Sequence, residues 1–323
     1  MSRVAVLKGG RSLERQVSLR SGARVADALG RLGHEVVPID LDLDLIHRLR
    51  DERVDVAFVA LHGRDGEDGT VQELLEIEGL PYTGSGVLAC ARSMDKVMTK
   101  HLLLGAGIPT PDFFAFTQTA FRELGAADTL PTIAERLEFP IVVKPSRQGS
   151  ALGIKFAAAA RDVPSALVSA FSYDERVLLE RHVAGRDLAV SVLDGPSGPE
   201  ALPVVEAVTQ DDAFYDFESR YEIGRTTFVC PADLPEGIGE QARRLALATY
   251  ELLGCYGFAR VDLMLSADHE LFVLEANSIP GLTDTSLLPQ AAEAAGIDFD
   301  DLVGRILELA FARAGERSAG TPG

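Results

Sequence analysis

The stretch that decides the fold reads Ala-Arg-Val-Asp-Leu-Met-Leu over residues 259–265 and Leu-Phe-Val-Leu-Glu-Ala-Asn-Ser-Ile-Pro-Gly over residues 271–281. A short polar segment separates these two apolar runs, and this pattern predicts a β-hairpin. Polar side chains recur two residues apart, first at Arg260 and Asp262 and then at Glu275 and Asn277. Because alternate residues of a strand share a face, each pair is expected on one face.

The length of the hairpin loop determines whether the two pairs meet. A four-residue loop at 267–270 pairs Ser266 with Leu271 and places Asp262 opposite Glu275. A five-residue loop pairs Leu265 with Leu271 and puts the two acids on opposite faces, because a shift of one residue inverts a strand. We expect the four-residue loop, in which Leu271, Met264 and Val273 share the face of the acids.

The apolar neighbours of the acids favour burial of both faces of the hairpin. Buried carboxylates require compensation, and a cluster of oxygen ligands suits a hard cation such as Mg²⁺. Asp262, Glu275 and Asn277 are therefore candidate metal ligands. The alternative is a hairpin whose acids face water or pair with Arg260.

Composition limits the class of protein. The chain has 323 residues, 46% of them hydrophobic and 25% charged, with a net charge of -18. These values are typical of a soluble globular protein of two or three domains, and the negative charge argues against nucleic acid as a partner. We expect no membrane segment and no signal peptide. Three cysteines without metal-type spacing predict reduced thiols in the cytoplasm.

The first hundred residues follow a strand–helix alternation. Apolar strands are expected at 3–7, 34–41 and 54–61, with helices between them, which predicts a doubly wound α/β domain. The loops after the first and third strands carry Glu14 and His62 at the edge where ligands bind. In isolation, Glu14 reads as a charge at a helix terminus and His62 as a structural histidine.

Further segments carry polar and glycine-rich patterns. A helix is expected over 87–104, and its lysines Lys96 and Lys100 lie one turn apart; we expect Lys100 to be a solvated surface lysine. A strand ending at Lys144 precedes the loop 146–153, rich in glycine and serine, whose backbone N–H groups could surround phosphate. The aromatic-containing segment 209–225 has the length of a lid loop.

Seven segments in this order resemble the ATP-grasp ligases and, within them, the D-alanine–D-alanine ligase family. The resemblance covers nearly the whole chain to about Ala314 and is carried by segments 9–18, 61–72, 93–96, 143–150, 214–221, 260–262 and 274–281. It implies an N-terminal α/β domain (1–94), a central ATP-grasp subdomain (95–184), and a C-terminal subdomain (185–314) that includes the lid loop 209–225. Residues 315–323 are expected to form a disordered tail.

The resemblance also implies roles that spacing alone does not assign. Residues implied to hold ATP are Lys96, Lys144, Ser150, Glu180, Arg181, Val183, Asp187 and Arg220. Asp262, Glu275 and Asn277 are implied to bind two Mg²⁺ or Mn²⁺ ions. Residues implied to contact the D-alanines are Glu14, His62, Arg260, Gly281, Ser286 and Leu287. Glu14, Ser150, Tyr221, Arg260 and the backbone of Gly281 are implied to act in catalysis.

The chain departs from the family pattern at four positions. Arg220 stands where lysine is usual, Ala151 where serine is common, and Gln148 and Asp187 where glutamate is frequent. Arginine keeps the charge of lysine but not its geometry, so the departures bear on rate or nucleotide affinity. Tyr221 rather than phenylalanine favours an amino acid over D-lactate as second substrate, again by resemblance.

The implied function is ATP-dependent ligation of two D-alanines through a D-alanyl phosphate, for peptidoglycan precursor synthesis in the cytoplasm. The resemblance suggests a homodimer and leaves a K⁺ requirement open. The alternatives are an ATP-grasp ligase for another D-amino acid or small carboxylate–amine pair, a nucleotide-binding protein without catalysis, and an NAD-dependent dehydrogenase. The absence of a Gly-x-Gly-x-x-Gly fingerprint counts against the last.

Overall fold

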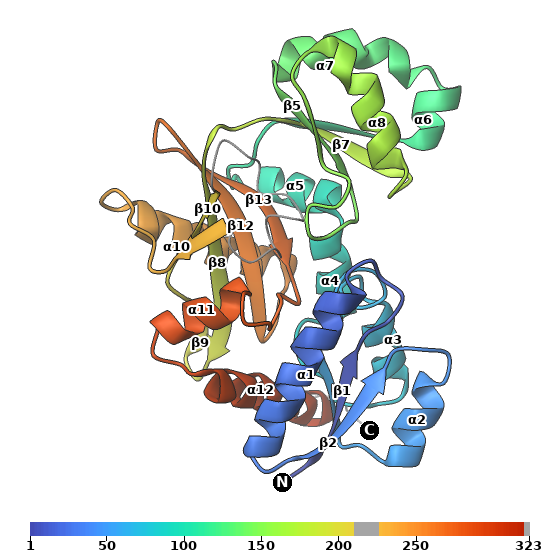
Figure 1. Ribbon diagram of the computed structural model, residues 1–323, viewed down its shortest axis with the longest axis vertical. Coiled ribbons are helices and arrows are strands. Elements are labelled where there is room, and N and C mark those ends of the chain that lie inside the picture. Colours follow the sequence, from blue (N-terminus) through green and yellow to red (C-terminus); the bar gives the residue numbers. More distant parts are fainter. Residues whose placement is uncertain (210–225, 320–323) are drawn as a thin grey trace.

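A computed structural model describes residues 1–209 and 226–319 of the chain. Its strands form three separate sheets. In Figure 1 the N-terminal domain lies at the bottom, a six-stranded sheet lies in the middle, and a four-stranded sheet with its helices lies at the top. Within the described ranges, no helix is long and apolar enough to span a membrane.

The N-terminal sheet is parallel, in the order β2-β1-β3. Its strands are β1 (Arg3–Lys8), β2 (Glu35–Asp40) and β3 (Val56–Val59). The helices of this part are α1 (Arg15–Arg31), α2 (Leu45–Glu52), α3 (Thr70–Ile77) and α4 (Val87–Met94). All residues of β3 are buried, as expected for a parallel strand covered on both faces. The predicted strand–helix alternation is therefore confirmed.

The four-stranded sheet is antiparallel, in the order β4-β7-β5-β6. Its strands are β4 (Phe113–Thr117), β5 (Ile141–Pro145), β6 (Lys155–Ala157) and β7 (Arg176–Arg181). Its helical segments are α6 (Gln118–Glu123), η1 (Ala126–Thr129), α7 (Leu130–Leu137), η2 (Ala160–Asp162) and α8 (Val163–Phe171). This unit has a hydrophobic core of its own, in which α7 and α8 pack on the sheet.

The six-stranded sheet follows the order β11-β10-β8-β12-β13, with β9 paired to β8. Its strands are β8 (Gly185–Gly195), β9 (Gly198–Ala201), β10 (Val205–Thr209), β11 (Thr226–Val229), β12 (Phe258–Ser266) and β13 (Leu271–Asn277). The last three helices are α10 (Ile238–Leu253), α11 (Leu287–Ala294) and α12 (Phe299–Ala319).

The hairpin β12–β13 contains a feature that the sequence did not predict. Near the turn Leu265 pairs with Leu271, so the expected four-residue loop is wrong. A β-bulge then shifts the register, and Asp262 lies opposite Glu275 with Arg260 opposite Asn277. The extra residue is Leu274, because the next pair is Leu263 with Val273. The bulge thus combines the register of the five-residue loop at the turn with the predicted register at the acids.

The bulge also corrects the expected faces of the second strand. Leu271 and Val273 lie in the hydrophobic core with Ala276, and not on the face of the acids. Leu274 instead lines a cavity next to Glu275.

Two helix boundaries differ from expectation. The helix expected over 87–104 is divided at Asp95, whose side chain caps α5 (Lys96–Gly105) by accepting from the N–H groups of Val97 and Met98. The last helix extends through Ala319, so it overlaps the expected tail 315–323, and 320–323 lie outside the described residues.

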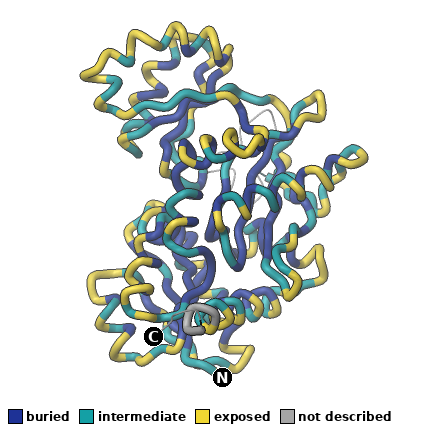
Figure 2. The backbone as a smooth tube through the Cα atoms, turned by 180° about the vertical axis from the view of Figure 1, so that it is seen from behind, coloured by how far each residue is buried: buried dark blue, intermediate teal, exposed yellow. Residues whose placement is uncertain are grey.

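The largest hydrophobic core joins the ends of the chain. Buried side chains of β1, β3 and α1 form one cluster with those of α11 and α12, and part of the six-stranded sheet joins it. In Figure 2 the buried segments, in dark blue, run through the interior, and exposed segments, in yellow, lie at the periphery. The C-terminal helix is therefore packed against the N-terminal domain.

Candidate active site

Two cavities meet at the end of the hairpin. The larger has a volume of about 550 Å³ and lies between the four-stranded and six-stranded sheets. The smaller has a volume of about 50 Å³ and lies against the N-terminal domain. Glu275 lines both. The larger volume is within the range of small-molecule and cofactor sites, whereas the smaller suits a group of a few atoms.

The predicted residues divide between these cavities. Those lining the larger cavity are Lys144, Glu180, Arg181, Val183, Asp187, Asp262, Glu275 and Leu287. Those lining the smaller cavity are Glu14, His62, Lys96, Ser150, Arg260, Glu275, Asn277 and Gly281. Ser286 lines neither cavity but lies beside Gly281, where an added Cβ would meet its Oγ at 2.6 Å. Arg220 and Tyr221 lie outside the described residues.

The hairpin presents charged groups along one edge of the two cavities. Arg260 donates from Nε and Nη2 to both oxygens of Asp262, at 2.6 and 2.8 Å. Lys96 Nζ lies 3.0 Å from Glu275 Oε2. Asn277 Oδ1 accepts from the N–H of Ile279 at 2.9 Å. The pairing of Asp262 with Arg260 is the alternative that the sequence left open, and the two buried charges compensate each other in this state.

The donor set on the hairpin fits a hard divalent cation. Asp262 and Glu275 lie opposite each other in the register and Asn277 follows on the same strand, so two carboxylates and an amide come together. Oxygen ligands of this kind suit Mg²⁺ or Mn²⁺. No group of three or more His, Cys, Asp or Glu side chains suited to a metal occurs in the described ranges. This set does not conflict with that result, because its third member is an amide.

Glu14 is the main polar group of the smaller cavity. It precedes α1, is 5% exposed, and accepts a hydrogen bond on Oε1 from Ser150 of the glycine-rich loop. Its Oε2 has no hydrogen-bond partner among the described residues. An added Cβ at Gly63 or Gly149 would lie 2.5 or 2.6 Å from this oxygen. A side chain at either position would displace the Glu14 carboxylate, and the free oxygen can accept from a bound cation or N–H group.

The electrostatic surroundings of Glu14 disfavour its charged form. Burial, together with the nearby Glu67 carboxylate, raises the pKa of the Glu14 carboxyl to about 7. The Ser150 hydrogen bond and the His62 and Lys96 side chains act in the opposite direction. A ligand bearing a positive charge would remove this penalty, because an opposite charge nearby favours the ionised acid.

His62 connects the N-terminal domain to the loop after β13. Its Nε2 lies 2.9 Å from Ser21 Oγ, and its Nδ1 lies 3.1 Å from the carbonyl of Ile279 and 3.3 Å from Glu67. Ser21 Oγ also accepts from the N–H of Leu282. The contact with Ile279 requires a proton on Nδ1, since a carbonyl can only accept. His62 thus fixes the loop that carries Gly281, as well as lining the cavity.

The wall of the larger cavity contains a buried carboxylate between two lysines. Glu180 of β7 accepts from Lys144 of β5, and its Oε2 lies 2.7 Å from Lys100 Nζ of α5. Lys100 is fully buried, so the expectation of a surface lysine is wrong. Lys100 lies one turn from Lys96 on α5, but its side chain faces the four-stranded sheet and not solvent. Only the packing of α5 determines this orientation.

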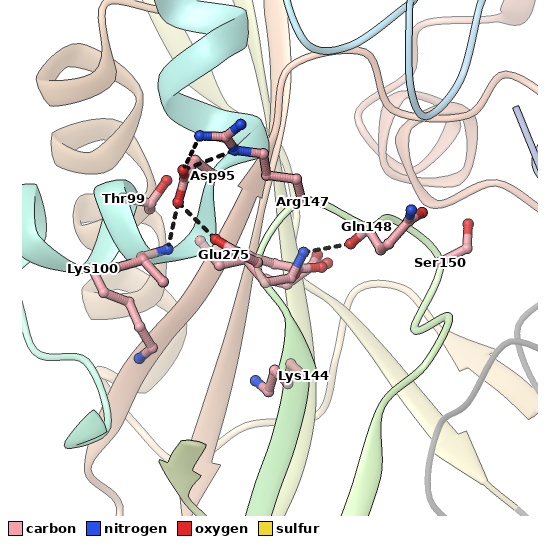
Figure 3. A network of polar contacts seen from close by, with 12 residues as sticks. Asp95, Thr99, Lys100, Lys144, Arg147, Gln148, Ser150 and Glu275 are labelled. Carbon is pink, nitrogen blue, oxygen red and sulfur yellow. Dashed lines mark hydrogen bonds and ion pairs between the residues drawn. The ribbon is translucent and has the colours of Figure 1, made fainter. Parts of the chain in front are cut away.

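The glycine-rich loop is anchored at its first residues. Asp95 accepts from Ser146 Oγ at 2.8 Å and from Arg147 Nε at 3.0 Å, in addition to capping α5. Figure 3 shows the Arg147 side chain reaching Asp95. Lys96 Nζ donates to the carbonyl of Gln148 at 2.6 Å. These contacts set the position of the loop where it turns toward Glu14.

Sequence reasoning missed Lys100, Asp95 and Glu67 as members of the site. An Asp directly before a helix could have been read as an N-cap, and this signal was present within the helix expected over 87–104. Glu67 lies in a loop with three other charges, and no pattern distinguishes it from its neighbours.

The chain is similar to known proteins over nearly its full length. Family models described as the D-ala D-ala ligase N-terminus and C-terminus match residues 45–85 and 102–308. The chain is 46% identical over 309 residues to the D-alanine–D-alanine ligase of Moorella thermoacetica, covering 96% of this chain and 99% of that protein. It is 45% identical over 312 residues to that of Anaeromyxobacter dehalogenans strain 2CP-1, covering 97% and 98%.

Solved structures are similar over the same length. The crystal structure of D-alanine–D-alanine ligase from Bacillus anthracis complexed with ATP is matched with a TM-score of 0.82 at 34% identity, covering 98% of this chain and 100% of that chain. The D-alanine–D-alanine ligase from Coxiella burnetii is matched with a TM-score of 0.81 at 26% identity, covering 98% and 96%.

Proposed function

Since the chain belongs to the D-alanine–D-alanine ligase family, whose ATP-dependent carbon–nitrogen ligases join two D-alanines, we propose how its own side chains divide that reaction. The observation that carries the proposal is the pair of cavities that meet at Glu275. The larger has the volume for a nucleotide, and the smaller contains the buried Glu14 carboxylate. The γ-phosphate and the first amino acid would then meet beside Glu275.

The nucleotide occupies the larger cavity in this proposal. Glu180 and the backbone of Arg181 and Val183 contact the base, Asp187 contacts the ribose, and Lys144 contacts the phosphates. All five line that cavity. Lys96 and the N–H groups of the loop that carries Ser150 reach the terminal phosphates from the smaller cavity. The chain has a net charge of -18, so these local cations are what attracts a polyanion to this point.

The first D-alanine binds with its ammonium group at Glu14. The Oε2 atom of Glu14 is buried without a hydrogen-bond partner among the described residues, and an ammonium group supplies both a proton and a charge. The carboxylate of this D-alanine then points toward Glu275 and attacks the γ-phosphate of ATP, which gives D-alanyl phosphate and ADP. Ser150 holds the Glu14 side chain in this orientation.

The second D-alanine attacks the acyl phosphate with its neutral amine. Arg260 and the N–H of Gly281 stabilise the oxyanion that forms on the acyl carbon, a contact worth about 3–4 kcal/mol per donor. Ser286 and the start of α11 at Leu287 bind the second carboxylate, since a helix N-terminus favours an anion. Tyr221 and Arg220, which lie outside the described residues, close the site in this proposal. Loss of phosphate gives D-alanyl-D-alanine.

Two Mg²⁺ or Mn²⁺ ions held by Asp262, Glu275 and Asn277 would offset the negative charge of the ATP phosphates. Before ATP binds, Arg260 compensates Asp262 and Lys96 compensates Glu275. We further propose a cytoplasmic location, consistent with three free cysteines, and a homodimer, which the family resemblance suggests. Light scattering tests the dimer, and exchange of KCl for NaCl in the assay tests a K⁺ requirement.

The test is phosphate release from ATP and Mg²⁺ with D-alanine, L-alanine, D-serine and D-lactate, each alone and together with D-alanine. Release that requires D-alanine, with D-alanyl-D-alanine as product, is expected. Glu275→Gln should abolish it, whereas Glu270→Gln, in the exposed hairpin turn, should not. Phosphate release without D-alanine dependence would instead indicate a ligase for another amino acid or carboxylate–amine pair.

A further inference from the structure

Lys100 is a fully buried lysine that the proposed reaction does not use. It lies on α5 behind the wall of the larger cavity, with no exposed surface. Its ammonium group lies 2.7 Å from Glu180 Oε2 and donates to Thr110 Oγ1 and to the carbonyl of Pro111 at 3.1 Å. An ammonium group has three protons, and three acceptors surround this one. Lys100 is therefore enclosed by protein groups and does not line the cavity.

Lys144 has a different position relative to the same carboxylate. It donates to the other oxygen of Glu180, but it lines the cavity on β5. Figure 3 shows the two lysines on separate elements, Lys100 on the helix and Lys144 on the strand. The Glu180 carboxylate compensates only one of the two ammonium groups, so Glu180, Lys100 and Lys144 together carry one net positive charge. A phosphate group entering the cavity can bind Lys144, whereas Lys100 cannot leave Glu180.

Lys100 is also connected to the hairpin. Thr110, which accepts from Lys100, donates to the carbonyl of Val273 at 2.7 Å, and the N–H of Val273 donates to the carbonyl of Pro109 at 2.8 Å. Val273 lies two residues before Glu275 on β13. The lysine is therefore held by contacts on both sides and cannot change partner without disturbing this chain of hydrogen bonds.

We propose that Lys100 is a positioning residue that keeps Glu180 ionised and oriented when Lys144 turns to the phosphates of ATP, and that it thereby sets the preference for adenine. The proposal rests on the proposed placement of ATP in the larger cavity. An ionised, fixed Glu180 accepts a hydrogen bond from the exocyclic amino group of adenine. Without Lys100, Glu180 would take a proton or retain Lys144, and either change would weaken this contact.

The test compares ATP with purine riboside triphosphate, which lacks the 6-amino group. In Lys100→Met the preference for ATP over this analogue should fall by about tenfold, the effect of one hydrogen bond to a charged group. The KM for ATP should rise while the KM for D-alanine changes less than about twofold. The matched control is Lys155→Met, which removes an exposed lysine of the neighbouring strand β6 and should leave the preference unchanged.

A double-mutant cycle distinguishes positioning from a purely structural role. In a Glu180→Gln background, Lys100→Met should cause no further loss of nucleobase preference, because Lys100 acts through Glu180. An unchanged preference in Lys100→Met, or equal effects in both backgrounds, would overturn the proposal. If Lys100→Met does not fold, Lys100→Gln, which keeps a polar group at the site, is judged by the same criteria.

The test can be separated from that of the proposed function. Nucleobase preference is also measured as the difference in thermal stabilisation by ATP and by the analogue, which needs no turnover. A wild-type protein that prefers ATP but releases no phosphate with D-alanine would contradict the proposed reaction and leave the role of Lys100 to be judged from binding. A wild-type protein that ligates D-alanine without any preference for ATP over the analogue would overturn the role of Lys100 alone.

Discussion

Single residues at this site are governed by burial. Glu14, Glu180 and Lys100 are all charged side chains that the fold removes from water, and each is compensated in a different way. Glu180 has two lysines, Lys100 has one carboxylate and two neutral acceptors, and Glu14 has only a hydroxyl on one oxygen. The least compensated of the three is Glu14, and it is the one expected to meet a cationic substrate.

The raised pKa of Glu14 predicts a pH dependence of D-alanine binding. The carboxyl has a pKa of about 7, so the ionised form that binds an ammonium group becomes populated as pH rises through about 7. We expect kcat/KM for D-alanine to rise as pH increases through about 7. The Glu14→Gln variant should lose most activity, and its remaining activity should not show this rise. A steady-state pH profile at saturating ATP measures it. A profile flat from pH 6 to 8 would contradict it.

The same group has a predictable effect on stability. The unfolded carboxyl has an ordinary pKa near 4.5, and the folded one retains its proton up to about 7. The folded state therefore loses relative stability as pH rises between these values, and the loss is complete above about 7. Glu14→Gln is expected to remove this dependence. Urea unfolding at pH 5 and pH 8, compared between the two proteins, measures it.

At the scale of elements, the site is assembled at helix and strand ends. Asp95 joins the end of α4 to α5 and also holds the first residues of the glycine-rich loop through Ser146 and Arg147. Gly185 begins β8, where an added Cβ would lie 1.9 Å from the carbonyl oxygen of Leu265. Both residues lie at short connections between consecutive elements and contact residues that are distant in the sequence.

Asp95→Asn is expected to separate the stability contributed by the helix cap from that contributed by the negative charge of Asp95. Asparagine is also a good N-cap, but it lacks the negative charge that Arg147 contacts. We expect a loss of about 1 kcal/mol in unfolding free energy and a raised KM for ATP, because the glycine-rich loop is less well held. Asp95→Ala should lose about 1 kcal/mol more, the value of the cap. Equal losses in the two variants, measured by urea unfolding, would show that the cap contributes nothing, and no loss in Asp95→Asn would show that the charge contributes nothing.

Gly185→Ala is expected to disturb the pairing of β8 with β12. The new methyl group would overlap backbone that cannot move as a flexible side chain does, at a cost of about 1–3 kcal/mol. ATP binding should weaken too, since Gly185 and Asp187 line the larger cavity. Gly30→Ala is the control, because nothing lies within 4 Å of its Cβ and it should stabilise α1 by about 0.5 kcal/mol. Calorimetry and nucleotide titration measure both.

At the scale of the whole molecule, one core connects the two ends of the chain. The cluster that contains β1, α1 and α12 also includes side chains of β8, whereas the four-stranded sheet has a separate core. The smaller cavity lies where these parts meet, with Glu14 from the N-terminal part, Ser150 from the central part and Arg260 from the hairpin. The site therefore depends on the relative placement of all three.

Leu307→Ala tests, at a position on α12, whether this shared core unfolds as one unit. Leu307 is buried in the shared core on α12, and its truncation should cost about 2–4 kcal/mol. Hydrogen exchange should accelerate in β1 and β8 together, while β5, in the separate core, keeps its protection. Glu308→Ala, on the exposed face of the same helix, should change stability by less than about 0.5 kcal/mol. Acceleration in β1 alone would show that the N-terminal part unfolds independently.

The sequence by itself determined the composition of the site. The spacing of two in Arg260–Asp262 and Glu275–Asn277 placed each pair on one face, and the motif order indicated the family that the comparisons then showed. The strand–helix alternation predicted the parallel sheet, because the periodicity of apolar residues is a local property of the chain. The domain boundaries and the roles of the site residues remain predictions.

Only the tertiary structure decided how these groups compensate one another. Lys100 and Lys96 have the same local pattern, yet one is fully buried against Glu180 and the other faces Glu275 in the cavity. The bulge at Leu274 likewise depends on which partners β13 finds along both edges. The physical reason is that burial and ion pairing arise between elements far apart in the chain, and no local pattern carries that information.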